Sequence, residues 1–369
     1  MHFEASLIFL TAFVLGLSIF PVFIRLYTKN NILDRRDHRK VHLNEVPTMG
    51  GVPILIAFTI ALFIWFSNDE LAENRYILGA LLFMLFIGLR DDFISLKPVV
   101  KLVSQLVPSL LIFYLTNLKI ESLYGFISST TFPVYLSLII TVITIIVITN
   151  SVNLIDGLDG LAGTISFVIL MSFGLWFFIQ GDHPYGMLLY AMAGAIFAFL
   201  QFNWQPAKIF MGDTGALILG FLIAVSTIKF ITLNNNLPVE NYLRFNGIIA
   251  TALAVLIIPL FDTLRIFTIR VIKGKSPFSP DKNHLHHTLM RLGLSHKQVS
   301  LLLALINFAF IGLAILFNDV SDNILVPSLF GLCLLLALIL DYIFIKFVLA
   351  KRDRTKTVLE IIKSSKKAS

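Results

Sequence analysis

The sequence predicts an all-α, polytopic integral membrane protein with about eleven transmembrane helices, its N-terminus outside and its C-terminus in the cytoplasm. Of its 369 residues, 57% are hydrophobic and only 14% are charged, whereas soluble proteins carry nearer a quarter charged residues. Apolar runs of roughly 17–25 residues, long enough to span a bilayer, recur along the chain. The basic residues between these runs fall on alternate loops, which indicates membrane topology and not nucleic-acid binding.

About eleven apolar runs give the expected order of the spans. The first follows His2 and Glu4 without a basic segment or a small-residue cleavage site, so we interpret it as a retained span and not as a signal peptide. The single cysteine, Cys333, lies in the last run and excludes an internal disulfide. The spans are expected near 3–27, 50–67, 75–90, 99–117, 132–149, 160–180, 184–201, 214–232, 245–267, 299–317 and 324–348.

The distribution of basic residues orients these spans. The chain has 29 Lys and Arg residues, and nearly all of them lie in or beside alternate loops and the C-terminal tail. The exceptions are Arg75, Lys119, Lys229 and Arg244. This bias places those loops in the cytoplasm, and an odd number of spans agrees with termini on opposite sides. We expect one transmembrane domain over 1–349, a basic cytoplasmic tail over 350–369, and cytoplasmic loops near 28–49, 90–98, 150–159, 202–213 and 268–298.

Five polar islands interrupt the apolar chain, all on the predicted cytoplasmic side. Ionisable groups at a membrane edge cost free energy, so a chain that keeps many on one face is expected to use them. Carboxylates suit a hard cation such as Mg²⁺, glycines allow close backbone approach, and Lys and His suit phosphate. The islands are PTMGG (47–51), GLRDDFISLKP (88–98), NSVNLIDGLDGLAG (150–163), FNWQPAKIFMGDTGA (202–216) and SPFSPDKNHLHH (276–287).

The second island contributes the adjacent acids Asp91 and Asp92. Neighbouring residues of a helix point about 100° apart, yet both can reach a pocket at a helix end. The alternative is a solvated pair that balances Arg90 and Lys97. Lys101, shortly beyond, either meets a phosphate or snorkels to the interface as an ordinary anchor.

The third island spaces Asn150, Asn153, Asp156 and Asp159 three residues apart. On a helix such residues lie near one face, so their side-chain oxygens form a row that suits a cation or a polar substrate. The alternative is a helix cap followed by a turn, because the neighbouring glycines weaken a helix.

The fourth island places Asp213 between Gly212 and Gly215, just before a span, with Lys208 upstream. A helix N-terminus favours anions, whereas Asp213 itself favours a cation. The alternative is that Asp213 or Thr214 simply caps the helix.

The fifth island carries His284, His286 and His287. Zinc is the less favoured interpretation, since this spacing lacks the cysteines and the i,i+4 pair of common zinc sites. Histidines that bind a diphosphate fit better. Asp262 and Arg265, spaced i,i+3, are expected to form a structural ion pair.

Together the islands, in this order over about residues 20–295, resemble the polyprenyl-phosphate N-acetylhexosamine-1-phosphate transferases, integral membrane enzymes that begin bacterial lipid-linked glycan assembly. SPFSPDKNHLHH is similar to the version in the branch that uses UDP-N-acetylglucosamine. Relatives often have a third acid four residues after the first of the pair, where this chain has Ser95. Asp91 and Asp92 are therefore the only carboxylates of their island.

The resemblance implies transfer of N-acetylglucosamine-1-phosphate from UDP-N-acetylglucosamine to undecaprenyl phosphate, which yields a lipid diphosphate sugar and UMP and depends on Mg²⁺, with Mn²⁺ as a substitute. Asp213 matches the family's metal ligand, with Asn153 as a second, and Asp91 matches the acid that deprotonates or orients the lipid phosphate. The remaining implied site residues are Asp92, Asp156 and Asp159 with catalytic roles, and Lys101, Asn150, Lys208, His284, His286 and His287 in substrate binding.

The expected setting is the cytoplasmic face of the bacterial inner membrane. The expected partners are a UDP-N-acetylhexosamine, a polyprenyl phosphate and the membrane, without nucleic acid, and a homodimer is compatible with the resemblance. Another UDP-N-acetylhexosamine would use the same chemistry. A secondary transporter is the alternative of another class, but its polar groups would lie nearer mid-membrane. A non-catalytic scaffold would bind no nucleotide.

Overall fold

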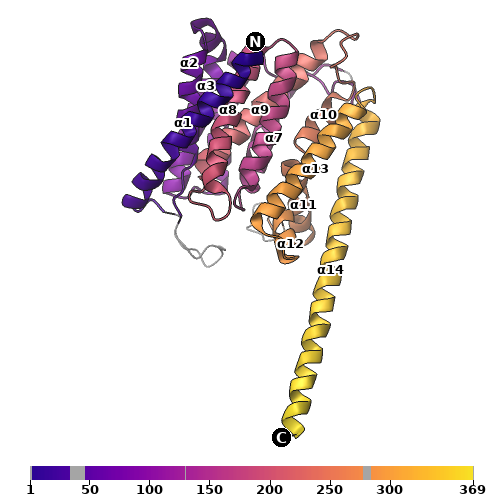
Figure 1. Cartoon of the computed structure of the whole chain (residues 1–369). Helices are drawn as coiled ribbons and strands as arrows, with labels where there is room; N and C mark the ends of the chain where they lie inside the picture. Colours follow the sequence, from indigo (N-terminus) through magenta and orange to yellow (C-terminus); the bar gives the residue numbers. More distant parts are fainter. Residues whose placement is uncertain (1, 34–45, 129, 277–283, 369) are drawn as a thin grey trace.

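The computed structural model describes residues 2–33, 46–128, 130–276 and 284–368, with side chains as far as residue 349. These residues contain no β-strand. The helices form one bundle, and α14 projects beyond it at the end opposite to the start of α1 (Figure 1). The helices are α1 (His2–Lys29), α2 (Gly51–Trp65), α3 (Asn68–Phe93), α4 (Pro98–Ser104), α5 (Leu106–Leu115), α6 (Val134–Leu154), α7 (Leu161–Ile179), α8 (His183–Asn203), α9 (Gly212–Asn236), α10 (Ile248–Val255), α11 (Ile257–Ile272), α12 (Leu285–Arg291), α13 (His296–Leu316) and α14 (Asp322–Ala368).

All the predicted apolar runs lie on these helices, which confirms the all-α, multi-pass prediction. Within the described residues, 8 helical segments are long and apolar enough to cross a membrane, or up to 9 if α10 and α11 form one bent span. The helix α2 is apolar but shorter, and α3 is not among these segments. The count of about eleven spans therefore stays a prediction.

Two of the predicted spans are broken into two helices, α4 with α5 and α10 with α11, and the second pair is bent by 84°. Each first helix ends four residues before a proline, Pro108 or Pro259. Proline lacks the N–H that would bond to the carbonyl one turn earlier, and its ring clashes with that carbonyl. At the second break Asn307 of α13 donates to the freed carbonyl of Val255 at 3.1 Å.

The helix α9 lies inside the bundle, and most of its residues are buried. Its N-terminal turn meets α2 and α3 through glycines. A Cβ atom at Gly88 would lie 2.3 Å from Thr214 Cα, and one at Gly51 would lie 2.3 Å from the Gly215 nitrogen. Only glycine permits so close an approach of two backbones. The start of α9 is therefore fixed against the start of α2 and the last turns of α3.

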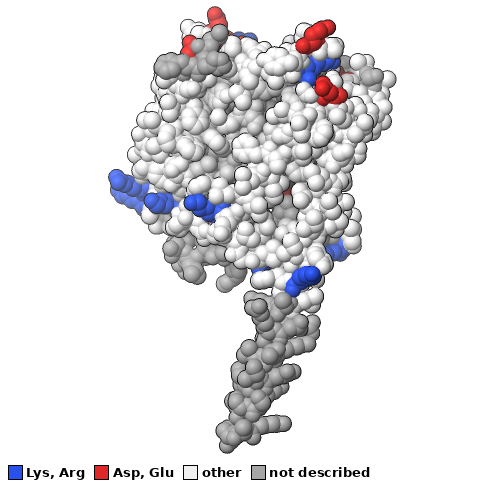
Figure 2. Space-filling model, turned by 45° about the vertical axis from the view of Figure 1, so that its right-hand side comes forward, with Lys and Arg blue, Asp and Glu red and all other residues white. Residues whose placement is uncertain are grey.

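The two ends of the bundle differ in charge. On the face shown in Figure 2, most of the visible Lys and Arg side chains lie toward the end from which α14 projects, and the Asp and Glu side chains lie at the other end. This separation agrees with the loop assignment made from the sequence. The side that faces the cytoplasm stays a prediction from the positive-inside rule.

Candidate active site

The N-terminus of α9 is capped by a carboxylate from another helix. Asp92, at the end of α3, accepts hydrogen bonds from the backbone N–H groups of Asp213 at 2.8 Å and Thr214 at 3.0 Å, and from the Thr214 hydroxyl. Met211, the residue that precedes α9, makes no side-chain cap. Because Asp92 satisfies these donors, the Asp213 carboxylate is not needed as a cap and is left for other partners.

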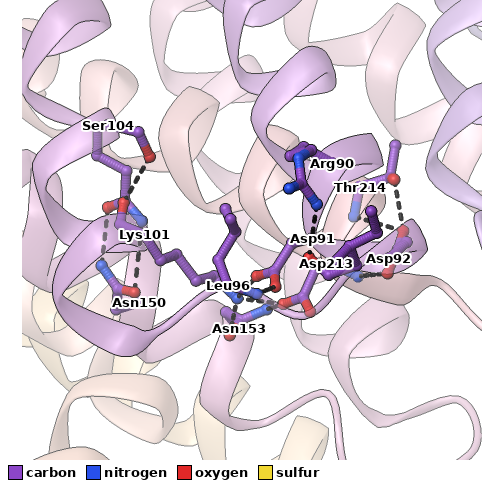
Figure 3. A network of polar contacts seen from close by, with 12 residues as sticks. Arg90, Asp91, Asp92, Leu96, Lys101, Ser104, Asn150, Asn153, Asp213 and Thr214 are labelled. Atoms are coloured by element: carbon purple, nitrogen blue, oxygen red, sulfur yellow. Dashed lines mark hydrogen bonds and ion pairs between the residues drawn. The ribbon is translucent and has the colours of Figure 1, made fainter.

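Lys101 joins three of the polar islands (Figure 3). Its ammonium lies 2.9 Å from Asp91 Oδ2, contacts Asp213 Oδ1 and donates to Asn153 Oδ1 at 3.2 Å. Asn153 Nδ2 donates to the same Asp213 oxygen at 2.7 Å, and the Leu96 N–H donates to Asp91 Oδ1 at 2.7 Å. The Lys101 side chain is only 13% exposed. The snorkelling alternative is therefore wrong, since the ammonium points inward to carboxylates.

The Asp91–Asp92 pair also differs from its solvated alternative. Asp91 is buried. Arg90 donates to the Ile94 carbonyl at 3.1 Å, and within the described residues it forms no ion pair with Asp91 or Asp92. The two acids have separate partners, as their angular separation on α3 requires. Asp91 faces the cation Lys101, whereas Asp92 faces backbone donors.

Asp156 and Asp159 follow α6 and lie in different surroundings. The Asp156 carboxylate makes no hydrogen bond with the described residues. Burial, followed by the charges of Asp213 and Asp92, raises the pKa of this carboxyl group well above the ordinary value. Asp159 is buried; its Oδ2 accepts from the Ala207 N–H at 3.3 Å and lies 3.5 Å from Nδ1 of His296. Asp156 therefore belongs electrostatically to the Lys101 cluster, while Asp159 packs toward α13.

The histidine island forms a second cluster with α11. His284 Nδ1 lies 2.7 Å from Asp262 Oδ2, and the Leu285 N–H donates to Asp262 Oδ1 at 2.9 Å. The predicted Asp262–Arg265 ion pair is wrong, because Arg265 instead binds Asp341 at 2.9 Å. Both oxygens of Asp262 are occupied by His284 and the Leu285 N–H, and Arg265 pairs with α14 instead.

His286 stacks on His284, with ring centroids 5.4 Å apart and an interplanar angle of 17°. It is buried, its Nε2 has no hydrogen-bond partner among the described residues, and a Cβ at Gly157 would lie 3.1 Å from this atom. Burial, and then the neighbouring His287, lower the pKa of His286 to about 3. The ring is therefore neutral at ordinary pH, with a free nitrogen beside the turn that holds Asp156.

Asn150 and Lys208 lie outside these clusters, whereas His287 belongs to the histidine cluster. Asn150 Nδ2 donates to Gln105 Oε1 at 2.8 Å and to the Ile146 carbonyl at 2.7 Å. Lys208 is exposed, and its side chain makes no hydrogen bond or ion pair with the described residues. His287 lies beside His286, with ring centroids 4.3 Å apart. Asp281 and Lys282, which the sequence places near these histidines, lie outside the described residues.

Sequence reasoning gave no catalytic or binding role to several residues that shape the site. Thr214 binds Asp92, Asp262 orients His284, His296 approaches Asp159, and Gln105 holds Asn150. Of these four residues, the sequence predicts a role for Thr214 and Asp262 alone, and in each case a structural one. A polar residue four positions after Lys101, within an apolar run, was the available signal for Gln105.

The two clusters suit different ligands. Asp213, Asn153 and Asp156 offer carboxylate and amide oxygens, which are the ligands of Mg²⁺. The unfavourable crowding of Asp156 with other carboxylates is what a divalent cation would relieve. Asp262, His284 and His286 place their ligand atoms within 4.8 Å of one another, the arrangement that the zinc alternative needs.

Fold and site define a multi-pass helical membrane protein with a cluster of carboxylates, amides and one lysine at a single end of its bundle. The model of glycosyl transferase family 4 matches residues 74–231. The chain is 33% identical to the undecaprenyl-phosphate alpha-N-acetylglucosaminyl 1-phosphate transferase of Pasteurella multocida, over 80% of both chains. It is 32% identical to that of Haemophilus influenzae, over 75% of this chain and 76% of the relative, and 27% identical to that of Escherichia coli K12, over 78% and 77%. The chain belongs to the polyprenyl-phosphate N-acetylhexosamine-1-phosphate transferase family.

Proposed function

We propose that this chain transfers N-acetylglucosamine-1-phosphate from UDP-N-acetylglucosamine to undecaprenyl phosphate at the cytoplasmic face of a bacterial inner membrane. The products would be a lipid diphosphate sugar and UMP, and the reaction would initiate lipid-linked cell-envelope glycan synthesis. One observation carries the proposal: Asp91, Asn153 and Asp213, from three separate islands, meet around Lys101. The names of the relatives, which specify this acceptor and this sugar phosphate, support it.

The chemistry requires that two anions meet. An oxygen of the lipid phosphate attacks the sugar-bearing β-phosphorus, the bond from that phosphorus to the bridging oxygen breaks, and UMP leaves. Catalysis therefore depends mainly on charge neutralisation and alignment. Lys101 supplies a buried positive charge, and Asp91, 2.9 Å from it, orients the acceptor. A phosphate has a second pKa near 6, so at about pH 7 it needs little help from a base.

Asp213 and Asn153 would hold Mg²⁺, with Asp156 beside them. The ion would neutralise the donor diphosphate and stabilise the charge that develops on the leaving phosphate. Asp92 keeps Asp213 in place, because it holds the first N–H groups of α9. Mn²⁺ accepts the same oxygen ligands and is expected to substitute.

The histidine cluster suits the nucleotide sugar. His284 is oriented by Asp262, and His286 is neutral with a free Nε2 that can accept or donate one hydrogen bond. His286 lies close to the Asp156 turn, since a Cβ at Gly157 would lie 3.1 Å from its Nε2. Hydrogen bonds from these rings would fix the diphosphate or the sugar next to the metal ligands.

The acceptor's chain would stay in the bilayer. Val99, Val100 and Val103 of α4 are 67%, 49% and 56% exposed, so the helix that carries Lys101 turns an apolar surface outward. A prenyl chain leaves lipid only at a large cost, because its methylene and methyl groups would be exposed to water. An apolar surface beside the lysine lets the phosphate reach Lys101 while the chain remains in lipid.

The test is a UMP-release assay with purified protein in detergent, undecaprenyl phosphate and a panel of UDP-sugars. We expect release with UDP-N-acetylglucosamine and Mg²⁺, and no release when either substrate is omitted. Preference for another UDP-N-acetylhexosamine would correct the sugar alone. Ion-coupled solute uptake by reconstituted vesicles, without UMP release, would replace the proposal with the transporter alternative.

A further inference from the structure

The short helix α4, which carries Lys101, is poorly held by packing. It has no buried residue, and its valines point outward. Dispersion contacts therefore contribute little to its position. The Lys101 ammonium contacts carboxylates on α3 and α9, but a long flexible side chain does not fix the position of its own backbone. Some other contact must therefore fix the position of the α4 backbone relative to the site.

Gln105 stands at the break between α4 and α5 and provides such a contact. It is 0% exposed although its side chain carries a primary amide. Its backbone carbonyl accepts a hydrogen bond from the Ser109 hydroxyl at 2.7 Å. Its Oε1 accepts from Asn150 Nδ2 at 2.8 Å, and its Nε2 donates to Asn150 Oδ1 at 3.5 Å. A buried amide is costly unless it is paired, so this reciprocal contact favours one arrangement of the break.

The spacing relates this amide contact to the site. Gln105 lies four residues after Lys101, and Asn150 lies three residues before Asn153, so each pair is separated by about one helical turn. The Gln105–Asn150 contact and the Lys101–Asn153 contact therefore join the same two segments at two points, one helical turn apart. Two such contacts define the register of α4 against α6, whereas one leaves it free to slide or rotate.

We propose that Gln105 and Asn150 are positioning residues, which hold α4 in the register that places the Lys101 ammonium between Asp91 and Asp213. The inference rests on the proposed transferase function and extends it to residues that touch no substrate. It reassigns Asn150 from substrate binding to support of the lysine. Loss of the amide contact should impair use of the lipid phosphate and leave the histidine cluster unaffected.

A purely structural buried pair would behave differently. It would lower the stability of the whole bundle and weaken binding of both substrates together. A positioning pair acts on turnover only through Lys101, so its removal should have no effect once Lys101 is gone. A double-mutant cycle measures this dependence directly.

The experiment compares Gln105→Met, Asn150→Leu and the double variant in purified full-length protein, each also in a Lys101→Ala background at high enzyme concentration. Gln105→Met keeps the length and burial of the side chain and removes the amide. We expect kcat/KM for undecaprenyl phosphate to fall about tenfold in each single variant, and no further in the double variant. The Kd for UDP-N-acetylglucosamine, measured by calorimetry, should stay within about twofold.

Tyr185→Phe is the matched control. It removes a buried hydrogen bond of 3.0 Å to Ser226 in another part of the bundle, and its kcat/KM should stay within about twofold of the wild-type value. A further loss of about tenfold from Gln105→Met in the Lys101→Ala background would overturn the inference, as would a parallel loss of donor affinity or unchanged turnover in the single variants. A wild-type protein that releases no UMP would refute the proposed function as well, whereas these outcomes with an active wild type refute the positioning role alone.

Discussion

Replacement of Lys101 by methionine tests whether its charge balances the buried Asp91 carboxylate. The two side chains are 13% and 6% exposed and 2.9 Å apart. Removal of one partner of a buried ion pair costs about 3–5 kcal/mol, since the other charge is left unpaired in a poor solvent. Asp91 keeps the Leu96 N–H, and Asp213 is 33% exposed. We therefore expect the lower end, about 3 kcal/mol.

The assay is thermal unfolding in detergent, followed by intrinsic fluorescence. At about 2 °C per kcal/mol for a long chain, Lys101→Met should lower the Tm by about 6 °C. Addition of Asp91→Asn should restore most of this loss, because a neutral amide needs no counter-charge. Both proteins should have strongly reduced transferase activity, measurable only at high enzyme concentration, since the phosphate loses its cation.

Lys119→Met is the matched control for the loss of a lysine charge. Lys119 pairs with Glu121 at 2.9 Å, but their side chains are 38% and 55% exposed. Exposed pairs contribute about 0–1 kcal/mol, so the Tm should hardly change. An unchanged Tm in Lys101→Met, or no recovery in the double variant, would refute the view that this lysine compensates a buried carboxylate.

Three further predictions concern the metal, the histidines and the topology. Asp213→Asn should retain the fold and lose most turnover at saturating Mg²⁺. EDTA should abolish the turnover of the wild-type protein, and Mg²⁺ or Mn²⁺ should restore it. Rescue by Zn²⁺ alone would instead support a metal at the histidines. The pKa of His286 is lowered to about 3 from an unfolded value near 6.5, so below pH 6.5 the unfolded chain binds a proton that the folded chain does not. Stability should therefore fall by about 1.4 kcal/mol between pH 7.5 and 5.5, as a lower Tm, and His286→Gln should remove that part. With Cys333 replaced by alanine, a cysteine within 67–74 should react with an impermeant reagent in intact cells, and one at Gly293 only after permeabilisation.

The sequence identified the residue types of the site better than their partners. The patterns of Asp91, Asn153 and Asp213 predicted polar groups at one end of the spans, and the structure brings them together around Lys101. Their functional roles stay predictions. Composition and spacing suffice for this prediction, because a charged group at a membrane edge costs free energy however the helices pack and is therefore expected to have a function.

The helix breaks could also have been predicted. Pro108 and Pro259 lie inside apolar runs long enough to span, so a hydropathy argument joins each run into one helix. The missing N–H acts one turn earlier, where each first helix ends. A proline rule would have located both breaks, but it would also have predicted one in α1, where Pro21 lies inside an unbroken helix. Whether a proline breaks a span, and the 84° bend between α10 and α11, therefore depend on packing.

The partners of the acids could not have been predicted, because three of them cap helices to which they do not belong. Asp92 of α3 caps α9, Asp322 of α14 binds the Ile249 and Ala250 N–H groups of α10, and Asp262 of α11 binds the first N–H of α12. A local capping rule looks for the acceptor next to the helix that it caps and so misses all three.

These contacts between helices also separate the roles of adjacent acids. Both oxygens of Asp92 accept hydrogen bonds from the start of α9, so protonation or displacement of Asp92 would disturb the helix that carries Asp213. Asp91 has one oxygen on a backbone N–H and the other on Lys101, a cation that a phosphate can share. The sequence presents the two as equivalent members of one pair. Their positions on α3, about 100° apart, assign Asp92 to the architecture of the site and leave Asp91 to face Lys101.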